Sequence, residues 1–286
     1  MNPRTERLAA GLYLVAVPIG TARDITLRAL DILASAEVLV AEDTRSLRHL
    51  MEIHGISLGD RPLWAYHDHN GGKMRPRIMA ALAEGRSVAY ASEAGTPMIA
   101  DPGFDLVRSA RDEGLGVIAA PGPSAVVTAL TVAGLPTDRF LFEGFLPNSA
   151  SQRKTALREI AGVQATLVFY ESPKRVAAML RDAAEVLGPD REAALCRELT
   201  KKFEEVIRAP LGQLAEEVGA RSLKGEIVVL IDRGTAITVD EAHIEARLRV
   251  ALESASVRDA ADKVAQETGW KRRQVYQMAL QIEKGE

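Results

Sequence analysis

The sequence has a single cysteine among its 286 residues, so no disulfide can form within the chain. This residue, Cys196, follows an apolar run at positions 193–195, which predicts a small buried core residue. A chain without disulfides suits a reducing compartment, and we expect a cytoplasmic protein. No Cys and His spacing resembles a zinc site, and His67 and His69 lack a third ligand nearby. We therefore expect no bound metal.

The sequence also lacks a long apolar run. Its longest stretch of low charge, residues 8–21, is interrupted by Gly11, Pro18 and Gly20. It falls short of the roughly 20 residues that a membrane-spanning helix needs. Glu6 dilutes the basic start, and no clear cleavage site follows, so we expect neither a signal peptide nor a membrane partner.

An excess of positive charge is missing as well. The chain has 36 Lys and Arg against 39 Asp and Glu, a formal net charge of -3. Proteins that bind nucleic acid mainly through charge are usually basic. Any RNA partner must therefore be met by a local patch.

What the sequence does contain is an alternation of short apolar strands and helix-length segments up to residue 121. Strands are predicted at 12–17, 37–41, 63–66, 87–91 and 116–119, with helices at 25–33, 44–53, 73–84 and 102–113. Strands that alternate with helices predict a parallel sheet covered on both faces. We assign residues 1–121 to a first α/β domain.

A second α/β domain is predicted over residues 122–235. Its strands are expected at 140–145, 166–170, 192–199, 204–209 and 226–231, with helices at 124–133, 150–160, 173–187 and 211–218. Two neighbouring strands before Pro210 have no helix between them, which favours a mixed sheet. Residues 234–240 resemble a linker to a small helical domain over 236–286.

This tail has the marks of a helix-turn-helix. Ser256 and Asp259 have the spacing of a capping box, and a basic cluster, Lys271, Arg272 and Arg273, opens the following helix. The tail is either a nucleic-acid contact or a packing domain with a solvated basic end.

Unusual loops follow all five strands of the first domain. Parallel sheets bind ligands beyond the carboxyl ends of their strands, so these loops predict one site. They contain Pro18 and Gly20, then Asp43 and Arg45, His67 and His69, Ser92–Gly95 with Asp101, and Ser124. No Gly-x-Gly-x-x-Gly or Gly-x-x-x-x-Gly-Lys-Ser/Thr motif follows a strand, which argues against a dinucleotide cradle or a P-loop.

The residues alone leave several roles open. Glu42 and Asp43 could act as a carboxylate pair, or Asp43 could cap the next helix. Ser124 lacks the Gly-x-Ser-x-Gly form of a nucleophile elbow and favours a ligand or cap contact. Lys174 and Arg175 present two cations, or they form a solvated turn, and the same choice applies to Lys224–Glu226.

Taken in order, the segments at 12–30, 41–45, 92–103, 121–125, 170–175 and 224–226 resemble a known family. Ala-Gly-Thr-Pro followed by Asp-Pro-Gly, Pro-Gly-Pro-Ser and Glu-Ser-Pro-Lys-Arg is similar to the small-subunit ribosomal RNA methyltransferases I. These are the 16S rRNA cytidine 2'-O-methyltransferases of the tetrapyrrole methylase superfamily. The resemblance covers nearly the whole chain, including the helical tail.

The resemblance implies two α/β domains with S-adenosylmethionine in the cleft between them, and a homodimer. Its implied cofactor contacts are Pro18, Gly20, Ser92, Glu93, Ala94, Gly95, Asp101, Ser124, Ala125, Phe169, Tyr170, Lys224 and Gly225. The implied substrate is a cytidine ribose in the decoding region of 16S rRNA, in the assembled small subunit. A small-molecule methylase of the same fold is the alternative.

A ribose hydroxyl is a weak nucleophile and benefits from a nearby base. The candidates for catalysis by location are Asp43, Glu171, Lys174 and Glu226, with Glu93 as a further acid in the same loops. The candidates for RNA contact are Arg45, His67, His69, Arg175, Lys271, Arg272 and Arg273. This chain departs from the family pattern at two positions. It has Thr21 where the family usually has Asn, and Glu93 where the family usually has Asp.

Overall fold

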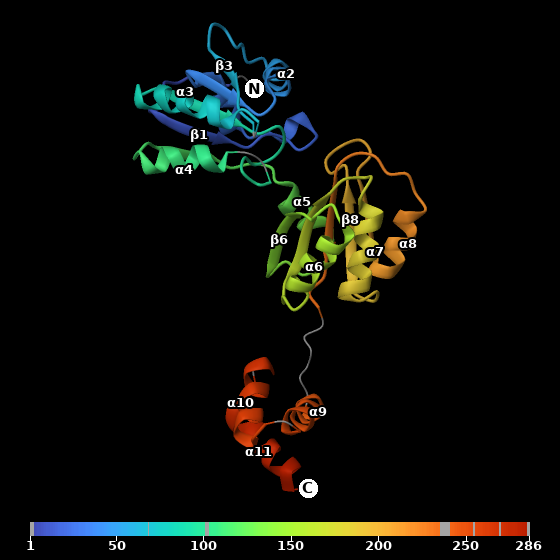
Figure 1. Cartoon of the computed structure of the whole chain (residues 1–286). Helices are drawn as coiled ribbons and strands as arrows, with labels where there is room; N and C mark the ends of the chain where they lie inside the picture. Colours follow the sequence, from blue (N-terminus) through green and yellow to red (C-terminus); the bar gives the residue numbers. More distant parts are fainter. Residues whose placement is uncertain are drawn as a thin grey trace. The chain divides into compact units, whose positions relative to one another are not determined.

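The computed structural model describes residues 3–67, 69–100, 103–234, 241–253, 255–268 and 270–284. The chain forms two compact units, residues 1–233 and 234–286. Figure 1 shows two α/β sheet structures in the first unit and a helical second unit. The α/β class with a helical tail is confirmed, while the predicted borders at 121/122 and 235/236 stay predictions.

The first sheet contains five strands, all parallel, in the order β3-β2-β4-β1-β5. Their bounds are β1 (Gly11–Val15), β2 (Val38–Ala41), β3 (Leu63–Ala65), β4 (Ser87–Ala91) and β5 (Val117–Ala120). Apolar residues occupy successive positions in β2 and β4, because helices cover both faces of the sheet.

Helices pack on both faces of this sheet. Those of the first sheet are α1 (Leu27–Ser35), α2 (Thr44–Ile53), α3 (Gly71–Ala83) and α4 (Phe104–Asp112), preceded by a 3-10 turn η1 (Ala22–Asp24). One face is packed by α1 and α2 and the other by α3 and α4. Since every strand runs the same way, the loops that follow them share one edge of the sheet.

The second sheet has the order β6-β7-β10-β8-β9 and is mixed, as the sequence predicts. Its strands are β6 (Phe140–Phe145), β7 (Thr166–Glu171), β8 (Glu192–Arg197), β9 (Glu205–Pro210) and β10 (Ile227–Ile231). β6 pairs with β7 in parallel, and the other pairings are antiparallel.

The two faces of the second sheet are covered by different helices. α6 (Ala150–Ile160), α7 (Val176–Leu187) and α8 (Leu211–Gly219) pack on one face, and α5 (Ala125–Val132) packs on the other. The prediction that a helix opens at residue 173 is wrong by three residues. The chain makes a turn at 173–175, and Arg175 occupies the N-cap position of α7 without a side-chain hydrogen bond to the helix.

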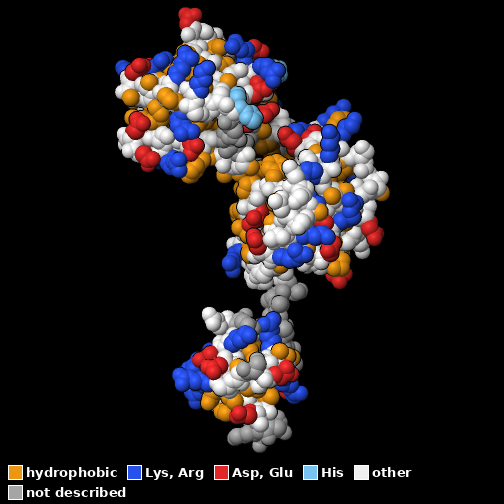
Figure 2. All heavy atoms as spheres, in the orientation of Figure 1, with side chains coloured by type: hydrophobic (Ala, Val, Ile, Leu, Met, Phe, Trp, Pro, Cys, Tyr) orange, Lys and Arg blue, Asp and Glu red, His pale blue; other side chains and the backbone are white. Residues whose placement is uncertain are grey.

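The second unit consists of α9 (Glu241–Leu252), α10 (Val257–Thr268) and α11 (Arg272–Lys284) around one apolar core. Ser256 caps α10 as predicted, because its hydroxyl accepts the backbone N–H of Asp259 at 3.2 Å. The predicted linker at 234–240 lies, apart from Gly234, outside the described residues. In Figure 2, Lys and Arg side chains are interspersed with Asp and Glu on the visible face of this unit.

Candidate active site

A cavity of about 450 Å³ lies among the loops of the first sheet and the strands of the second. Its lining includes Ile19, Glu42, Glu93–Thr96 and Ser124–Ala125 from the first half, and Phe145, Tyr170–Pro173, Cys196, Leu199 and Gly225–Val228 from the second. The cavity therefore brings together residues that are more than 180 positions apart in the sequence.

The 92–97 loop reaches the cavity as a folded-back segment held by its own backbone. Val17 and Gly95 exchange backbone hydrogen bonds of 2.9 and 3.1 Å. The buried Ser92 hydroxyl donates to the Gly95 carbonyl at 3.0 Å, and the Thr96 hydroxyl donates to the Pro123 carbonyl at 2.8 Å. Gly95 has a φ of +75°, and a Cβ there would lie 3.2 Å from Cγ2 of Ile19. The glycine thus permits both the turn and the close packing.

Two carboxylates line this cavity, Glu171, which is buried, and Glu42, which is partly buried. The Glu171 side chain is 1% exposed, its Oε1 accepts the Ser172 N–H at 2.7 Å, and its Oε2 lies 3.3 Å from Nη2 of Arg175. Within the described part of the chain, Oε2 makes no hydrogen bond. Glu42 accepts the Glu93 N–H at 3.2 Å. The wall of the cavity is therefore rich in acceptors and suits a cationic ligand.

Glu226 also lines the cavity but differs from Glu171 in exposure. Its side chain is 72% exposed and pairs with Nζ of Lys201 at 2.9 Å. The same ammonium contacts Glu198 at 2.9 Å. The hydrogen bond from Lys201 is the main reason that the pKa of Glu198 lies below its ordinary value, so this carboxylate is charged at neutral pH.

Two of the predicted catalytic candidates lie away from the cavity. Asp43 caps α2, where Oδ1 accepts the Arg45 N–H at 2.7 Å and Oδ2 pairs with the Arg45 guanidinium at 3.0 Å. These hydrogen bonds from Arg45 lower the pKa of Asp43. The capping alternative is thus the one the structure supports. Lys174 is exposed and does not line the cavity.

Phe169 requires a correction. Its side chain is fully buried on the face of β7 that packs against α6 and α7, away from the cavity. Tyr170 belongs to the opposite face and lines the cavity. Alternation along a strand sends neighbouring side chains to opposite faces, so only the backbone of Phe169 could reach a cofactor.

Pro18, Gly20 and Ser92 line a separate hollow beside α2. A Cβ on Gly20 would lie 2.5 Å from Cγ of Lys201, and one on Gly225 would lie 2.3 Å from Cδ of Glu198. Both glycines therefore make room for the loop after β8.

Lys224 is exposed and lies outside the cavity lining, and its backbone carbonyl accepts a hydrogen bond from Nη1 of Arg197 at 3.2 Å. Asp101 lies outside the described residues.

The predicted RNA-contacting side chains differ in their exposure and in whether they are already bound to other groups of the protein. Arg45 is 91% exposed, and the His67 and His69 rings lie 6.0 Å apart between centroids. Lys271 and Arg273 are exposed, and Arg272 is bound to Asp262 of α10. Arg175 is committed inside the protein, where Nη2 donates to the Leu146 carbonyl at 2.5 Å and contacts Glu171. The prediction that Arg175 contacts RNA is therefore not supported by its placement.

The sequence reasoning missed several lining residues, of which Cys196 is the most informative. It was assigned to the core, and its side chain is fully buried, yet it borders the cavity. Burial raises the pKa of its thiol to about 12, so it is neutral and a poor nucleophile near pH 7. Phe145 ends β6, Cys196 is the last residue but one of β8, and Leu199 follows β8. Their nearness to strand ends is the only signal that the sequence offers for them.

The described helices include none long and apolar enough to cross a membrane. Over the same part of the chain, no three His, Cys, Asp or Glu side chains gather as metal ligands would.

Two family models match this chain. The model of the tetrapyrrole (corrin/porphyrin) methylases matches residues 11–215. The chain belongs to the tetrapyrrole methylase family. A second family model, the RsmI C-terminal HTH domain, matches residues 238–283, which include all three tail helices from Glu241 almost to the end of α11.

Tetrapyrrole methylase relatives extend over nearly the full chain. Ribosomal RNA small subunit methyltransferase I of Mesorhizobium japonicum is 45% identical and covers 96% of this chain and 93% of its own length. The protein of the same name from Escherichia coli O157:H7 is 41% identical, with 94% of each chain covered. The similarity to these methyltransferases thus extends over both the α/β region and the helical tail.

Solved structures of the family share the fold. A uroporphyrin-III-C-methyltransferase from Thermus thermophilus has a TM-score of 0.56 at 21% identity, covering 80% of this chain and 96% of that one. A cobalt precorrin-4 methyltransferase gives 0.58 at 16% identity, covering 77% and 94%. At this identity the likeness concerns the fold alone.

Proposed function

We propose that this chain transfers a methyl group from S-adenosylmethionine to the ribose 2'-hydroxyl of a cytidine in the decoding region of 16S rRNA. The substrate in this proposal is the assembled small subunit, and the protein acts as a cytoplasmic homodimer. The observation that carries the proposal is the match to rRNA methyltransferases over both the α/β region and the helical tail. A tetrapyrrole-sized substrate would not need such a tail.

The residues of the cavity fit S-adenosylmethionine. About 450 Å³ falls within the range of pockets for ligands of this size. The tight turn at Gly95 leaves backbone amides free of bulky side chains, and the Glu171 and Glu42 carboxylates match a ligand that carries positive charge. Its holders would be Glu93, Ala94, Gly95, Ser124, Ala125, Tyr170 and Gly225. When bound, the cofactor supplies an electrophilic methyl group on a sulfonium.

The chain's own contribution is to position the hydroxyl and to remove its proton. We assign the base to Glu171, because Oε2 is buried in the cavity wall and makes no hydrogen bond within the described residues. Glu171 Oε2 would accept the proton of the 2'-hydroxyl while the ribose oxygen forms its bond to the methyl carbon. The bond between that carbon and the sulfonium sulfur would break in the same step, and the sulfur would leave as the neutral thioether S-adenosylhomocysteine. Alignment of the two reacting atoms at about 3–3.5 Å provides much of the remaining acceleration.

Exposed apolar side chains support the homodimer. Val127 and Val132 of α5 and Phe140 and Phe145 of β6 are between 43% and 56% exposed. Apolar side chains of this size are costly to leave in water, and burial between two copies of the chain would remove that cost. Sedimentation of the purified chain at micromolar concentration should show a dimer.

The decisive experiment uses small ribosomal subunits that lack the modification. They are incubated with the purified protein and isotopically labelled S-adenosylmethionine, and the label is mapped by nuclease digestion and mass spectrometry. Label on the ribose of one cytidine supports the proposal. A protein that binds the cofactor and leaves the RNA unlabelled would be a small-molecule methylase.

Replacement of Gly95 by Ala should weaken the binding of S-adenosylmethionine. Its φ of +75° and the Ile19 contact at 3.2 Å disfavour any side chain. Strain of this kind costs about 1–3 kcal/mol, so we expect the dissociation constant from calorimetry to rise about 5- to 150-fold. Gly72→Ala is the matched control, since a Cβ at Gly72 meets nothing within 4 Å. Equal affinities for the two variants would remove Gly95 from the cofactor site.

Removal of the free tail cations should reduce the salt dependence of subunit binding. Lys271→Ala with Arg273→Ala removes two exposed charges, while Arg272 stays bound to Asp262. The slope of log K against log salt should fall by roughly 1.5–2. Arg28→Ala with Arg158→Ala makes the same change in net charge on exposed helical positions and should leave the slope unchanged. Identical slopes for both pairs would exclude the tail from the RNA contact.

A further inference from the structure

The segment between β8 and β9, residues 198–204, is a firmly held loop, which we call the β8–β9 loop. Its first residue is bound to the turn before β10: Glu198 N–H donates to the Glu226 carbonyl at 2.9 Å, and Glu226 N–H donates to Oε1 of Glu198 at 3.0 Å. Lys201 then contacts both carboxylates at 2.9 Å. Three of these four contacts join the loop to a turn that lines the cavity, and the fourth, between Lys201 and Glu198, holds the loop itself.

The same loop is bound to the first α/β half. The Thr21 N–H donates to Oγ1 of Thr200 at 3.1 Å, and the Thr21 hydroxyl donates to the Thr200 carbonyl. The Thr200 N–H in turn donates to Oε2 of Glu204 at 2.5 Å. The Thr21 hydroxyl therefore has a defined partner in the β8–β9 loop.

The backbone of the loop adopts conformations that side chains disfavour. Glu198 has a φ of +52° and Thr200 a φ of +65°. A β-branched residue rarely adopts the left-handed region, and such strain persists only where surrounding contacts impose it. Strained residues cluster at functional sites, so the strained backbone of this loop indicates that its conformation has a functional role.

The shape presents an aromatic side chain to solvent. Phe203 is 64% exposed, and Nζ of Lys202 lies 5.6 Å from the centroid of its ring. Leu199 of the same loop lines the cavity, and so does Glu226, which Lys201 contacts. Folding does not account for an exposed ring on a rigid loop, because the ring contributes little to the core.

We propose that Phe203 and Lys202 form a stacking platform for an unpaired nucleobase of the RNA strand that presents its ribose to the cavity. The inference rests on the proposed function. Aromatic rings stack on unpaired bases without regard to sequence, and an adjacent ammonium meets the phosphate of the same nucleotide. A nucleotide held out of a helix can bring its 2'-hydroxyl into a concave cavity, and the platform provides that hold.

The test compares Phe203→Ala with Phe203→Trp in the full-length protein. Alanine should lower kcat/KM for the small subunit about 5- to 150-fold, and tryptophan should restore it, because either aromatic ring can stack. The KM for S-adenosylmethionine and the melting temperature should not change. Phe104→Ala is the matched control, because Phe104 is 62% exposed with the Arg108 guanidinium 5.4 Å from its ring.

A direct binding measurement separates this proposal from the proposed function. Fluorescence anisotropy with a labelled single-stranded cytidine-containing oligonucleotide should show weaker binding by Phe203→Ala, whether or not methyl transfer is observed. A wild-type enzyme that labels no RNA would overturn the proposed function. Equal oligonucleotide affinity for wild type and Phe203→Ala would overturn the platform, as would a tryptophan variant as weak as alanine. A loss accompanied by a change in oligomeric state would identify Phe203 as a protein interface instead.

Discussion

Replacement of Glu171 by Gln should lower the single-turnover rate of methyl transfer about 100- to 10,000-fold at saturating S-adenosylmethionine. Glutamine has nearly the same shape and can still accept the Ser172 N–H that Oε1 accepts at 2.7 Å. It cannot take a proton from a ribose hydroxyl. The loss should therefore appear in the chemical step, measured by rapid quench with enzyme in excess of small subunits.

Glu226→Gln is the matched control for this prediction. Both carboxylates line the cavity, but Glu226 is 72% exposed and bound to Lys201, while Glu171 is 1% exposed. We expect less than a fivefold effect from Glu226→Gln, since an exposed ion pair contributes about 0–1 kcal/mol. A Glu171→Gln enzyme that retains a tenth of the wild-type rate would exclude Glu171 as the base.

Replacement of Arg153 by Ala should lower the free energy of unfolding by about 3–5 kcal/mol. The Arg153 side chain is 6% exposed and binds the Asp182 carboxylate at 2.5 and 2.7 Å. Its Nη1 also donates to the Asn148 carbonyl at 3.1 Å. Without Arg153, a carboxylate that is 13% exposed would keep only Lys154, at 3.7 Å, as a cationic partner. Urea denaturation measures the change.

Arg158→Ala tests the specificity of this effect on the same helix. Arg158 is exposed, and truncation of exposed side chains usually changes stability by less than about 0.5 kcal/mol. The double variant Arg153→Met with Asp182→Asn should be more stable than Arg153→Ala, because no buried charge is left unpaired. A loss below 1 kcal/mol in Arg153→Ala would show that the ion pair is solvated or dispensable.

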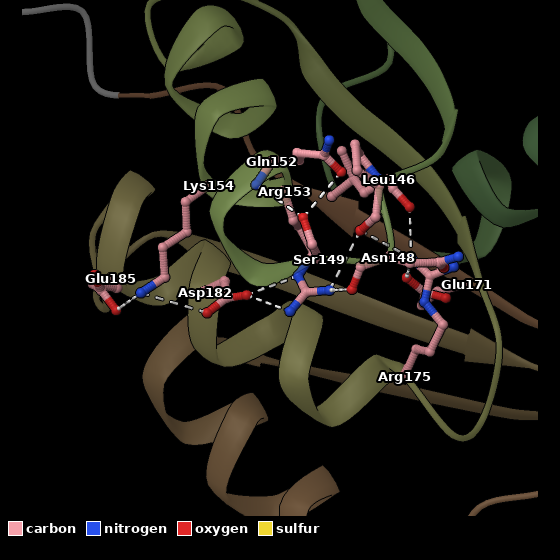
Figure 3. Close-up of polar contacts among 11 residues, drawn as sticks. Leu146, Asn148, Ser149, Gln152, Arg153, Lys154, Glu171, Arg175, Asp182 and Glu185 are labelled. Atoms are coloured by element: carbon pink, nitrogen blue, oxygen red, sulfur yellow. Dashed lines mark hydrogen bonds and ion pairs between the residues drawn. The ribbon is translucent and has the colours of Figure 1, made fainter.

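The predictions for Glu171 and Arg153 concern neighbouring contacts around the segment that follows β6. Figure 3 shows Arg153 and Arg175 on opposite sides of the segment after β6, and both donate to its carbonyls. Arg175 binds the Leu146 carbonyl and also lies 3.3 Å from the Glu171 carboxylate. Phe145, the residue before this segment, lines the cavity. The cavity wall at Glu171 is thus supported from α6 and α7 behind it.

Much of the fold could be predicted from local sequence pattern. Apolar runs such as 87–91 and 227–231 are long enough for a buried strand and too short for a helix, and they became β4 and β10. The alternation of strands and helices up to residue 121 required a parallel sheet, which in turn required the connecting loops to share one edge. This argument accounts for the side of the candidate site formed by the first sheet, and the second sheet supplies the rest of its lining.

The roles of individual residues at that edge could not be predicted in the same way. Asp43 follows β2 and Glu171 ends β7, and both are carboxylates, yet one caps a helix with its side chain 25% exposed and the other is buried in a cavity wall. Phe169 and Tyr170 are neighbours with opposite environments, and the sequence pattern of β7, apolar on both faces, does not reveal which face meets a ligand.

The sequence by itself determined the two α/β sheets, the capped helix of the tail and the edge at which loops gather, because each depends on residues close together in the chain. Tertiary structure alone decided that Thr21 binds Thr200, that Gly20 and Gly225 make room for the β8–β9 loop, and that Arg175 is held inside the protein. Thr21 and Thr200 are 179 positions apart. Contacts at such separation arise from packing of complete elements, which local periodicity does not encode.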